Sequence, residues 1–202
     1  YNLTPHTYIE MQLYKKLIFY KTFDDVVDNL PAHITHIEFG DDFNKPVNNL
    51  PSNLVFLEFG IKFDQPIDNL PITLKSLSLG ALFCQSLNNL PASIEYLSCI
   101  NNDITYLNNL PVSLKLLRCN DNKIEQMQLP PNLIKLDCSY NKLTDLGTLP
   151  ATLTELNCSF NDITNLNNLP NSLKYLNCSF TKILKLHNLP HSLDYYNVIK
   201  TK

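Results

Sequence analysis

The dipeptide Leu-Pro recurs along the chain at an almost constant interval, and this periodicity constrains the fold more than any other feature. The dipeptide occurs nine times, and seven of the eight intervals are twenty residues long while one is nineteen. A fixed period of this length is typical of a solenoid, in which each repeat contacts only its neighbours. The nine copies are Leu30-Pro31, Leu50-Pro51, Leu70-Pro71, Leu90-Pro91, Leu110-Pro111, Leu129-Pro130, Leu149-Pro150, Leu169-Pro170 and Leu189-Pro190.

Each proline is followed by three apolar columns in the pattern Pro-x-x-Leu-x-x-Leu-x-Cys. The last two columns are two residues apart, which is the period of a strand with one buried face. The second column contains Ile37, Leu57, Leu77, Leu97, Leu117, Leu136, Leu156, Leu176 and Tyr196. The third contains Phe39, Phe59, Leu79, Cys99, Cys119, Cys138, Cys158, Cys178 and Val198. The pattern therefore predicts one short strand in every repeat.

Strands that all run in the same direction form a parallel sheet, and each return path is long enough for a parallel crossover. The return path carries a proline and an Asn-rich turn, so we expect extended, turn or short 3₁₀ structure there rather than α-helices. It also holds its own apolar residues, such as Ile104, Leu107 and Leu110 in one repeat. A single repeat cannot bury this face alone, which means that neighbouring repeats must stack.

Two sequence patterns share this period. The second half contains CSYNKL at 138–143 and CSFNDI at 158–163, and it resembles the Leu-Pro type of leucine-rich repeat known from bacterial effectors. The first half contains FGDDFNKPVNNLP at 39–51 and FGIKFDQPIDNLP at 59–71, and it resembles the FNIP repeats of amoebae and giant viruses. The resemblance implies an α/β-type leucine-rich-repeat horseshoe with a parallel sheet on the concave face and a mostly non-helical convex side.

We expect a single leucine-rich-repeat domain over residues 1–202. Residues 1–13 would form an N-terminal cap, residues 14–189 about nine repeats, and residues 190–202 the last strand and the C-terminal end. Residues after the last strand are few, and the thin cap favours either self-association through the solenoid ends or a continuation of the chain.

The composition suits a folded chain and excludes several classes of protein. Hydrophobic residues make up 44% and charged residues 17%, and the net charge is −3. A nucleic-acid binder usually shows a basic patch, so we expect no nucleic-acid partner. No apolar run reaches the roughly 20 residues of a membrane helix, so we expect no membrane partner either. The chain contains only four glycines, and no Gly-rich phosphate-binding motif is present.

Five of the six cysteines fill one buried column at the repeat period, which differs from the CxxC spacing of metal sites. We interpret them as reduced structural thiols, and these favour an intracellular location, either the cytoplasm of the source cell or that of a host cell. Cys84 lies outside the column and is the candidate exposed thiol. The histidines show no metal-ligand spacing. Distant repeats of a solenoid do not converge on one point, so we predict a non-enzymatic protein without metal or cofactor.

Asparagines form a second column, at Asn102, Asn122, Asn141 and Asn161, and we expect them to satisfy backbone groups of adjacent repeats. The first half lacks this column, and there the side chains of Phe43, Phe63 and Phe83 take over as packing elements. A further aromatic column, at Tyr140, Phe160 and Phe180, is expected to form an edge stack where the strands end and to extend a binding rim.

The residues between the buried columns should face the concave side. These positions vary in chemistry while the buried columns do not, and their aromatic side chains are of the kind enriched in protein interfaces. Aromatic residues also simply suit strands, so a purely structural role is the competing interpretation. The predicted partner-binding residues are Phe56, Glu58, Tyr96, Arg118, Lys135, Glu155, Tyr175 and Tyr195.

The resulting functional hypothesis is a scaffold that binds an unidentified partner protein through its concave face. The alternative is the substrate-recognition part of a ubiquitin-ligase system, because some FNIP proteins carry an F-box and some Leu-Pro effectors carry a ligase domain. Residues 1–13 are too few for an F-box, so this alternative requires a domain outside the sequence. A repeat array retained for assembly alone is a third possibility, which a concentration-dependent oligomer would favour.

Overall fold

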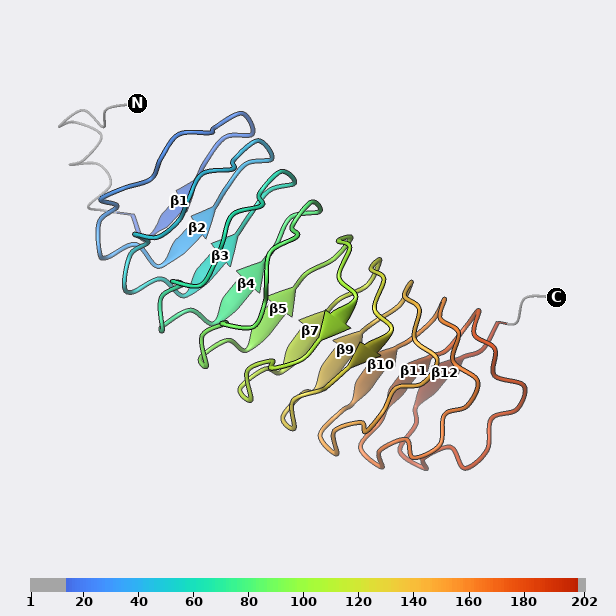
Figure 1. Cartoon of the computed structure of the whole chain (residues 1–202). Helices are drawn as coiled ribbons and strands as arrows, with labels where there is room; N and C mark the ends of the chain where they lie inside the picture. Colours follow the sequence, from blue (N-terminus) through green and yellow to red (C-terminus); the bar gives the residue numbers. More distant parts are fainter. Residues whose placement is uncertain (1–13, 200–202) are drawn as a thin grey trace.

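The computed structural model describes residues 14–199, and these form a stack of similar coils that contribute one three-residue strand each to a ten-stranded sheet (Figure 1). The strands are parallel and follow each other in chain order. They are β1 (Lys16–Ile18), β2 (His36–Glu38), β3 (Phe56–Glu58), β4 (Ser76–Ser78), β5 (Tyr96–Ser98), β7 (Leu116–Arg118), β9 (Lys135–Asp137), β10 (Glu155–Asn157), β11 (Tyr175–Asn177) and β12 (Tyr195–Asn197).

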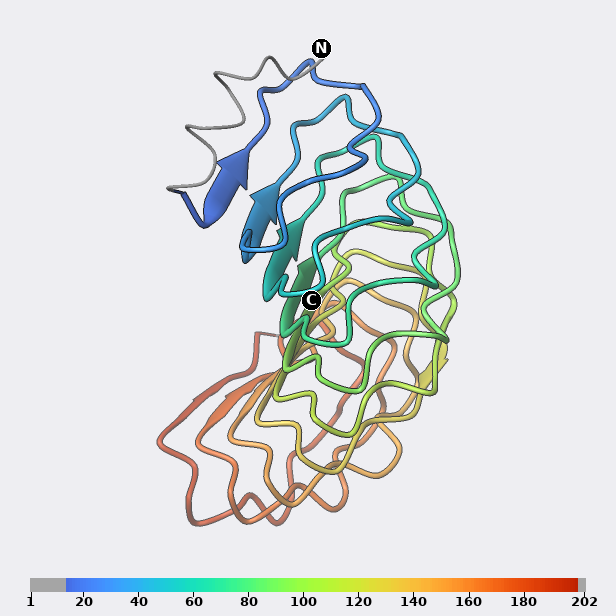
Figure 2. The same ribbon diagram turned by 90° about the vertical axis from the view of Figure 1, so that its left-hand side faces the viewer.

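The coils fan out along an arc, with the ten-stranded sheet on the inner side and the return paths on the outer side (Figure 2). The return paths consist of turns and extended chain, and residues 14–199 contain neither an α-helix nor a 3₁₀ segment. Two return paths pair as a small parallel sheet, formed by β6 (Tyr106–Leu107) and β8 (Gln126–Met127). The predicted horseshoe with a helix-poor convex side is therefore confirmed.

The core is one continuous apolar column between the sheet and the return paths. The predicted strand columns are buried from Ile37 to Leu176 and from Phe39 to Cys178, and return-path residues such as Leu107 and Leu166 complete the core from the other side. Strand registers match residue for residue, for example Leu57 opposite Leu77 and Leu77 opposite Leu97. Because each side chain lies over its counterpart in the next coil, the core extends along the whole array.

The last coil departs from the predicted burial. Tyr196 falls in the second buried column, yet its side chain is 56% exposed, and Leu193 and Val198 are only half-buried. Within the described residues β12 has a neighbouring strand on one side only, which leaves its core side chains partly uncovered. Tyr14, next to the first strand at the other end of the array, is also exposed. The predicted cap at 1–13 lies outside the described residues.

Phenylalanine and glycine hold the first coils together. Phe43 and Phe63 are fully buried and stack along the solenoid axis with ring centroids 6.0 Å apart, and within one coil Phe59 and Phe63 lie 3.6 Å apart. A Cβ atom on Gly60 would overlap the backbone carbonyl group of Gly40, because successive turns approach closely there. Only glycine permits this approach of two backbones.

Asparagine and cysteine replace them in the later coils. The side-chain amide of Asn141 donates to the carbonyl oxygens of Cys119 and Cys138 at 2.9 and 3.1 Å, and its Oδ1 accepts the N–H of Ile124 at 2.9 Å. Asn122 and Asn161 make equivalent contacts. The predicted structural role of this column is confirmed, because each asparagine satisfies backbone groups of two adjacent coils.

The two hydrogen-bond ladders run in opposite directions and meet in one coil. In the first half a side chain accepts from the following coil, as when Asp64 Oδ1 accepts the N–H of Cys84 at 2.8 Å. In the second half the asparagine accepts from the preceding coil, and Asn102 Oδ1 accepts the N–H of Phe83 at 2.7 Å. The adjacent N–H groups of Phe83 and Cys84 are therefore satisfied from opposite sides, and this coil joins the two halves.

Candidate binding surface on the concave face

Four consecutive strands of the sheet line one hollow on the concave face, with a volume of about 300 Å³. The variable positions of β7, β9, β10 and β11 bring together Arg118, Lys135, Glu155 and Tyr175, which are half of the residues predicted to bind a partner. Side chains of a strand alternate between its two faces, so residues on either side of the buried leucine column must face outward here. The outward direction of these four side chains thus follows directly from the repeat pattern.

The hollow carries charges of both signs. Lys135 Nζ lies 2.7 Å from Glu155 Oε1, and each of the two side chains is 46% exposed. An ion pair this exposed contributes little stability and can exchange its partner. Arg118 is also exposed, and it lies opposite Asp137 in the register of β7 and β9. The surface therefore offers a guanidinium, an ammonium group and carboxylates to a partner.

Two polar residues, Asp137 and Asn157, also line the hollow, although they were not among the predicted binding residues. Asp137 Oδ1 accepts a hydrogen bond from Ser139 Oγ at 2.6 Å, and Asn157 Oδ1 accepts one from Ser159 Oγ at 2.8 Å. These bonds bend the chain at the end of each strand, as Asp and Asn side chains commonly do two residues before a turn. The Asp/Asn-x-Ser spacing in the sequence is the signal that could have indicated this role.

The other predicted residues lie along the same face but outside the hollow. Tyr195 stacks on Tyr175 with ring centroids 5.2 Å apart, and it extends the hollow toward the last strand. Phe56 is half-buried and stacks on His36 at 5.7 Å, while Glu58 beside it is exposed. Tyr96 is half-buried between these two groups. The concave face therefore presents two aromatic clusters near its ends rather than one continuous patch.

The described residues hold no metal-binding cluster, and the buried cysteines are protonated thiols. No group of three or more His, Cys, Asp and Glu side chains within 14–199 could hold a metal ion. Burial raises the pKa of the Cys99 thiol to about 12, and it raises the pKa of Cys119 and Cys158 well above the ordinary value. A protonated, buried thiol is a poor nucleophile. No helix in the described part of the chain is long and apolar enough to cross a membrane.

Comparison with known proteins agrees with this architecture. The model of the FNIP Repeat family matches residues 26–62, which lie in the phenylalanine-rich half. YopM from Yersinia enterocolitica WA-314 superposes with a TM-score of 0.64 and 25% identity over 88% of this chain. YopM from Yersinia pestis, described as a leucine-rich effector protein, superposes with a TM-score of 0.67 and 22% identity over 84% of this chain. CroV588, described as a circular leucine-rich-repeat structure, superposes with a TM-score of 0.68 and 28% identity over 92% of this chain.

The chain is shorter than the structures that it resembles. It spans 50% and 61% of the two YopM chains and 33% of CroV588. Among the curated proteins none matches the sequence. The chain therefore shares its repeat architecture with part of each of these structures. With the Yersinia pestis protein, which is 22% identical, it shares the fold alone.

Proposed function

We propose that this chain, a leucine-rich-repeat protein with FNIP repeats in its N-terminal region, is a non-enzymatic scaffold that binds another protein through its concave face. Solenoids of this class typically act as protein–protein interaction scaffolds, because their stacked repeats create an extended concave surface. One observation carries the proposal: Arg118, Lys135, Glu155 and Tyr175 come from four successive strands and line one hollow.

The chemistry of this hollow supports a protein partner. Tyrosine and arginine are enriched among the residues that dominate the binding energy of protein interfaces. Tyr175 and Tyr195 expose 37% and 52% of their surface, and their rings stack on each other. Because stacking already restricts these two side chains, ordering them on binding costs little conformational entropy. The neighbouring charges have both signs, which favours a partner of complementary pattern over the uniformly charged backbone of a nucleic acid.

The cysteines support a reducing compartment. All six are free thiols, and the five in the core point into the same apolar column. We infer that the chain functions inside a cell, because oxidising environments favour paired cysteines in structural positions. Blocking of Cys84 but not of the five buried thiols by a thiol reagent on the native chain would fit this inference.

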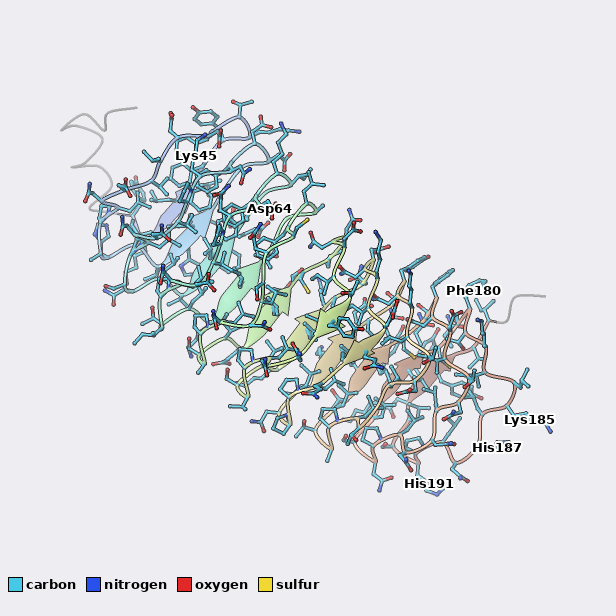
Figure 3. The ribbon with its side chains drawn as sticks, in the orientation of Figure 1. Lys45, Asp64, Phe180, Lys185, His187 and His191 are labelled. Atoms are coloured by element: carbon cyan, nitrogen blue, oxygen red, sulfur yellow. The ribbon has the colours of Figure 1, made fainter. Side chains whose placement is uncertain are left out.

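Affinity purification with a matched pair of variants tests the proposal. The concave variant combines Lys135→Glu with Tyr175→Ala, and the control combines Lys185→Glu with Tyr106→Ala on the outer side. Lys185 is exposed on the return path between β11 and β12, at the end of the stack in Figure 3, and Tyr106 lies on β6 and is 60% exposed. Both variants change the same residue types at exposed sites, so their effects on folding should be similar.

We expect proteins captured by the unmodified chain to be retained by the control and to fall at least about tenfold with the concave variant, which is the loss expected when one interface hot spot is removed. Quantitative mass spectrometry of the captured proteins measures this ratio. Equal capture by the concave variant, or selective loss with the control, would place the binding surface elsewhere on the solenoid.

A further inference from the structure

A second surface lies along the edge of the solenoid where the strands end, which we call the strand-exit rim. It comprises the residues that follow the third buried column in each coil, and Phe180 marks it near the C-terminal end in Figure 3. Large apolar side chains are exposed on this rim, although they lie outside both the core and the concave face. The fractional exposures are 48% for Ile61, 56% for Leu82, 49% for Tyr140 and 36% for Phe160.

The aromatic residues of the rim sit in a backbone conformation that disfavours them. Tyr140, Phe160 and Phe180 have φ values of 53°, 53° and 54°, in the left-handed region. Asn101 and Asp121 occupy the equivalent position in the preceding coils, and they adopt this conformation at much lower cost. Bulky side chains in such positions are outliers whose strain must be compensated by packing or by a role in binding.

Stacking accounts for part of this arrangement. The ring of Phe160 lies between those of Tyr140 and Phe180, with centroids 4.0 and 4.4 Å away. Both faces of the Phe160 ring, and one face each of Tyr140 and Phe180, are therefore covered within the stack. The other face of Tyr140 is turned toward the preceding coil, where Asp121 holds the equivalent position instead of another ring. One aromatic face thus remains available next to a carboxylate.

That face borders a hollow of about 720 Å³ at the junction of the two halves. Tyr140 and Asp121 line one end of the hollow, and Ile61 and Leu82 line the other. The hollow lies where the rim changes along the array, from aliphatic residues at Ile61 and Leu82, through the short polar side chains of Asn101 and Asp121, to the aromatic ring of Tyr140. It is separate from the concave hollow and shares no residue with it.

The charges around the hollow leave one carboxylate without a cation. Lys123 Nζ pairs with Asp103 Oδ1 at 2.8 Å. Asp121 Oδ2 accepts a hydrogen bond from the neutral amide of Asn120 at 2.7 Å, and within residues 14–199 no Lys, Arg or His forms an ion pair with it. With two aspartates and one lysine the lining carries a net charge of −1. A ligand with a positive group at this end and apolar groups at the other complements it.

We propose that the strand-exit rim binds an extended segment of a partner protein, with an arginine against Tyr140 and Asp121 and aliphatic side chains over Leu82 and Ile61. A guanidinium stacks on an aromatic face while donating hydrogen bonds to a carboxylate, and an ammonium group does this less well. Asp121 and Leu82 are two coils apart, roughly 10 Å at the spacing of parallel strands. An extended peptide advances about 3.3 Å per residue, so side chains two and four residues from the arginine lie about 7 and 13 Å away, on either side of that distance.

Two short synthetic peptides serve as probes, with the sequences Ser-Arg-Thr-Leu-Thr-Leu-Ser and Ser-Leu-Thr-Leu-Thr-Arg-Ser, both blocked at their ends. They present the same groups in the two possible chain directions. In matched control peptides citrulline replaces arginine, which keeps the shape and removes the charge. Titration into the ¹⁵N-labelled chain, followed by amide NMR shifts, reports both the affinity and the place of binding.

We expect saturable shifts at Leu82, Asp121 and Tyr140 with at least one arginine peptide, and at least tenfold weaker binding of its citrulline counterpart. Asp121→Asn and Tyr140→Asn should each weaken binding at least tenfold while the fold is retained, because asparagine tolerates the left-handed conformation. Asp162→Asn and Phe180→Asn, farther along the same rim, should leave it unchanged. Absence of saturable shifts with both arginine peptides, equal binding of citrulline, or insensitivity to Asp121→Asn would each overturn the proposal.

Discussion

The two halves of this solenoid reach the same architecture with different chemistry. Coils before the junction stack phenylalanine rings and press glycine backbones together, whereas coils after it bury thiols and bridge their backbones with asparagine. The ten-stranded sheet nevertheless runs without interruption from β1 to β12, and only one repeat interval departs from twenty residues. The difference teaches that the repeat length and the buried strand columns determine the fold, while the means of joining adjacent coils is interchangeable.

The junction shows how such an exchange becomes possible. In the first half, a side-chain oxygen of one coil accepts the backbone N–H at the equivalent position of the next coil, and the acceptors are Asp24, Asn44 and Asp64. The series ends at Cys84, because a thiol is a weak acceptor. From Asn102 onward the opposite ladder begins. The coil between them donates one backbone N–H in each direction. No buried side-chain nitrogen or oxygen in the described residues lacks a partner.

Gly60→Ala should produce the largest effect. The added Cβ atom meets backbone of the preceding coil, which cannot move without separating the stacked phenylalanine rings. We expect a loss of about 4 kcal/mol or more in the free energy of unfolding in urea, which is in the range of severe core mutations. Gly147→Ala is the control, because no atom lies near its Cβ position; its φ of 60° alone should cost only about 1–2 kcal/mol. Equal losses would refute close backbone packing as the basis of the first half.

Asn141→Ala should have the next largest effect, confined to the second half. It removes the amide group that donates to the carbonyl oxygens of Cys119, Cys138 and Ser139, and it leaves the buried N–H of Ile124 without its acceptor. Unsatisfied buried groups cost about 1–3 kcal/mol each, so we expect a loss of about 2–4 kcal/mol. Hydrogen exchange should accelerate at Ile124 and Leu143 more than at Phe63. Uniform acceleration throughout the chain would show that the halves do not differ in local stability.

Alkaline pH should weaken the second half selectively. Burial raises the pKa of Cys99 to about 12, while an unfolded thiol titrates near 9.0. The stability that this shift contributes is complete below pH 9 and is lost as the pH rises toward 12, at about 1.4 kcal/mol per pH unit for each thiol. Cys99→Val should flatten the dependence of unfolding free energy on pH by that amount above pH 9 and leave it unchanged between pH 6 and 8. A slope that stays the same above pH 9 would argue against a buried thiol.

Acidic pH should have the smallest effect on stability, and this effect should arise in the first half of the solenoid. The hydrogen bond from Lys45 and that from the N–H of Asn44 lower the pKa of Asp24 below its ordinary 3.8. A lowered carboxyl pKa stabilises the fold above pH 3.8, and this contribution disappears as the pH falls through the folded-state value. Asp24→Asn keeps an acceptor for Asn44 but not the charge, so its melting temperature should fall less between pH 5 and 3. If the melting temperature of the variant falls more steeply than that of the unmodified chain, the charged form of Asp24 does not stabilise the fold.

The fold could be predicted from the sequence because its determinants are periodic. Leu-Pro spacing gives the coil length, and the alternation around Leu57 or Leu156 gives the strands and their buried face. The glycine contacts escaped the prediction, although Gly40, Gly60 and Gly80 recur at the same period. Periodicity shows which positions are equivalent, but close approach of two backbones depends on how the coils are tilted and packed.

The candidate surfaces were predictable in part. Alternation identifies which side chains face the concave side, and it placed Arg118, Lys135, Glu155 and Tyr175 there. That these four line one hollow, while Phe56 and Tyr96 lie outside it, depends on side-chain directions that a pattern of letters does not contain. The left-handed backbone of Tyr140 was equally invisible, because this aromatic residue ordinarily avoids that conformation.

Hydrogen exchange at two adjacent amides tests the central claim, that oppositely directed ladders meet in one coil. Asp64→Ala removes the acceptor of the Cys84 N–H, and Asn102→Ala removes that of the Phe83 N–H. We predict that the first variant accelerates exchange at Cys84 but hardly at Phe83, and that the second does the reverse. If either variant accelerates both amides equally, the two halves are not joined by independent ladders and the account is wrong.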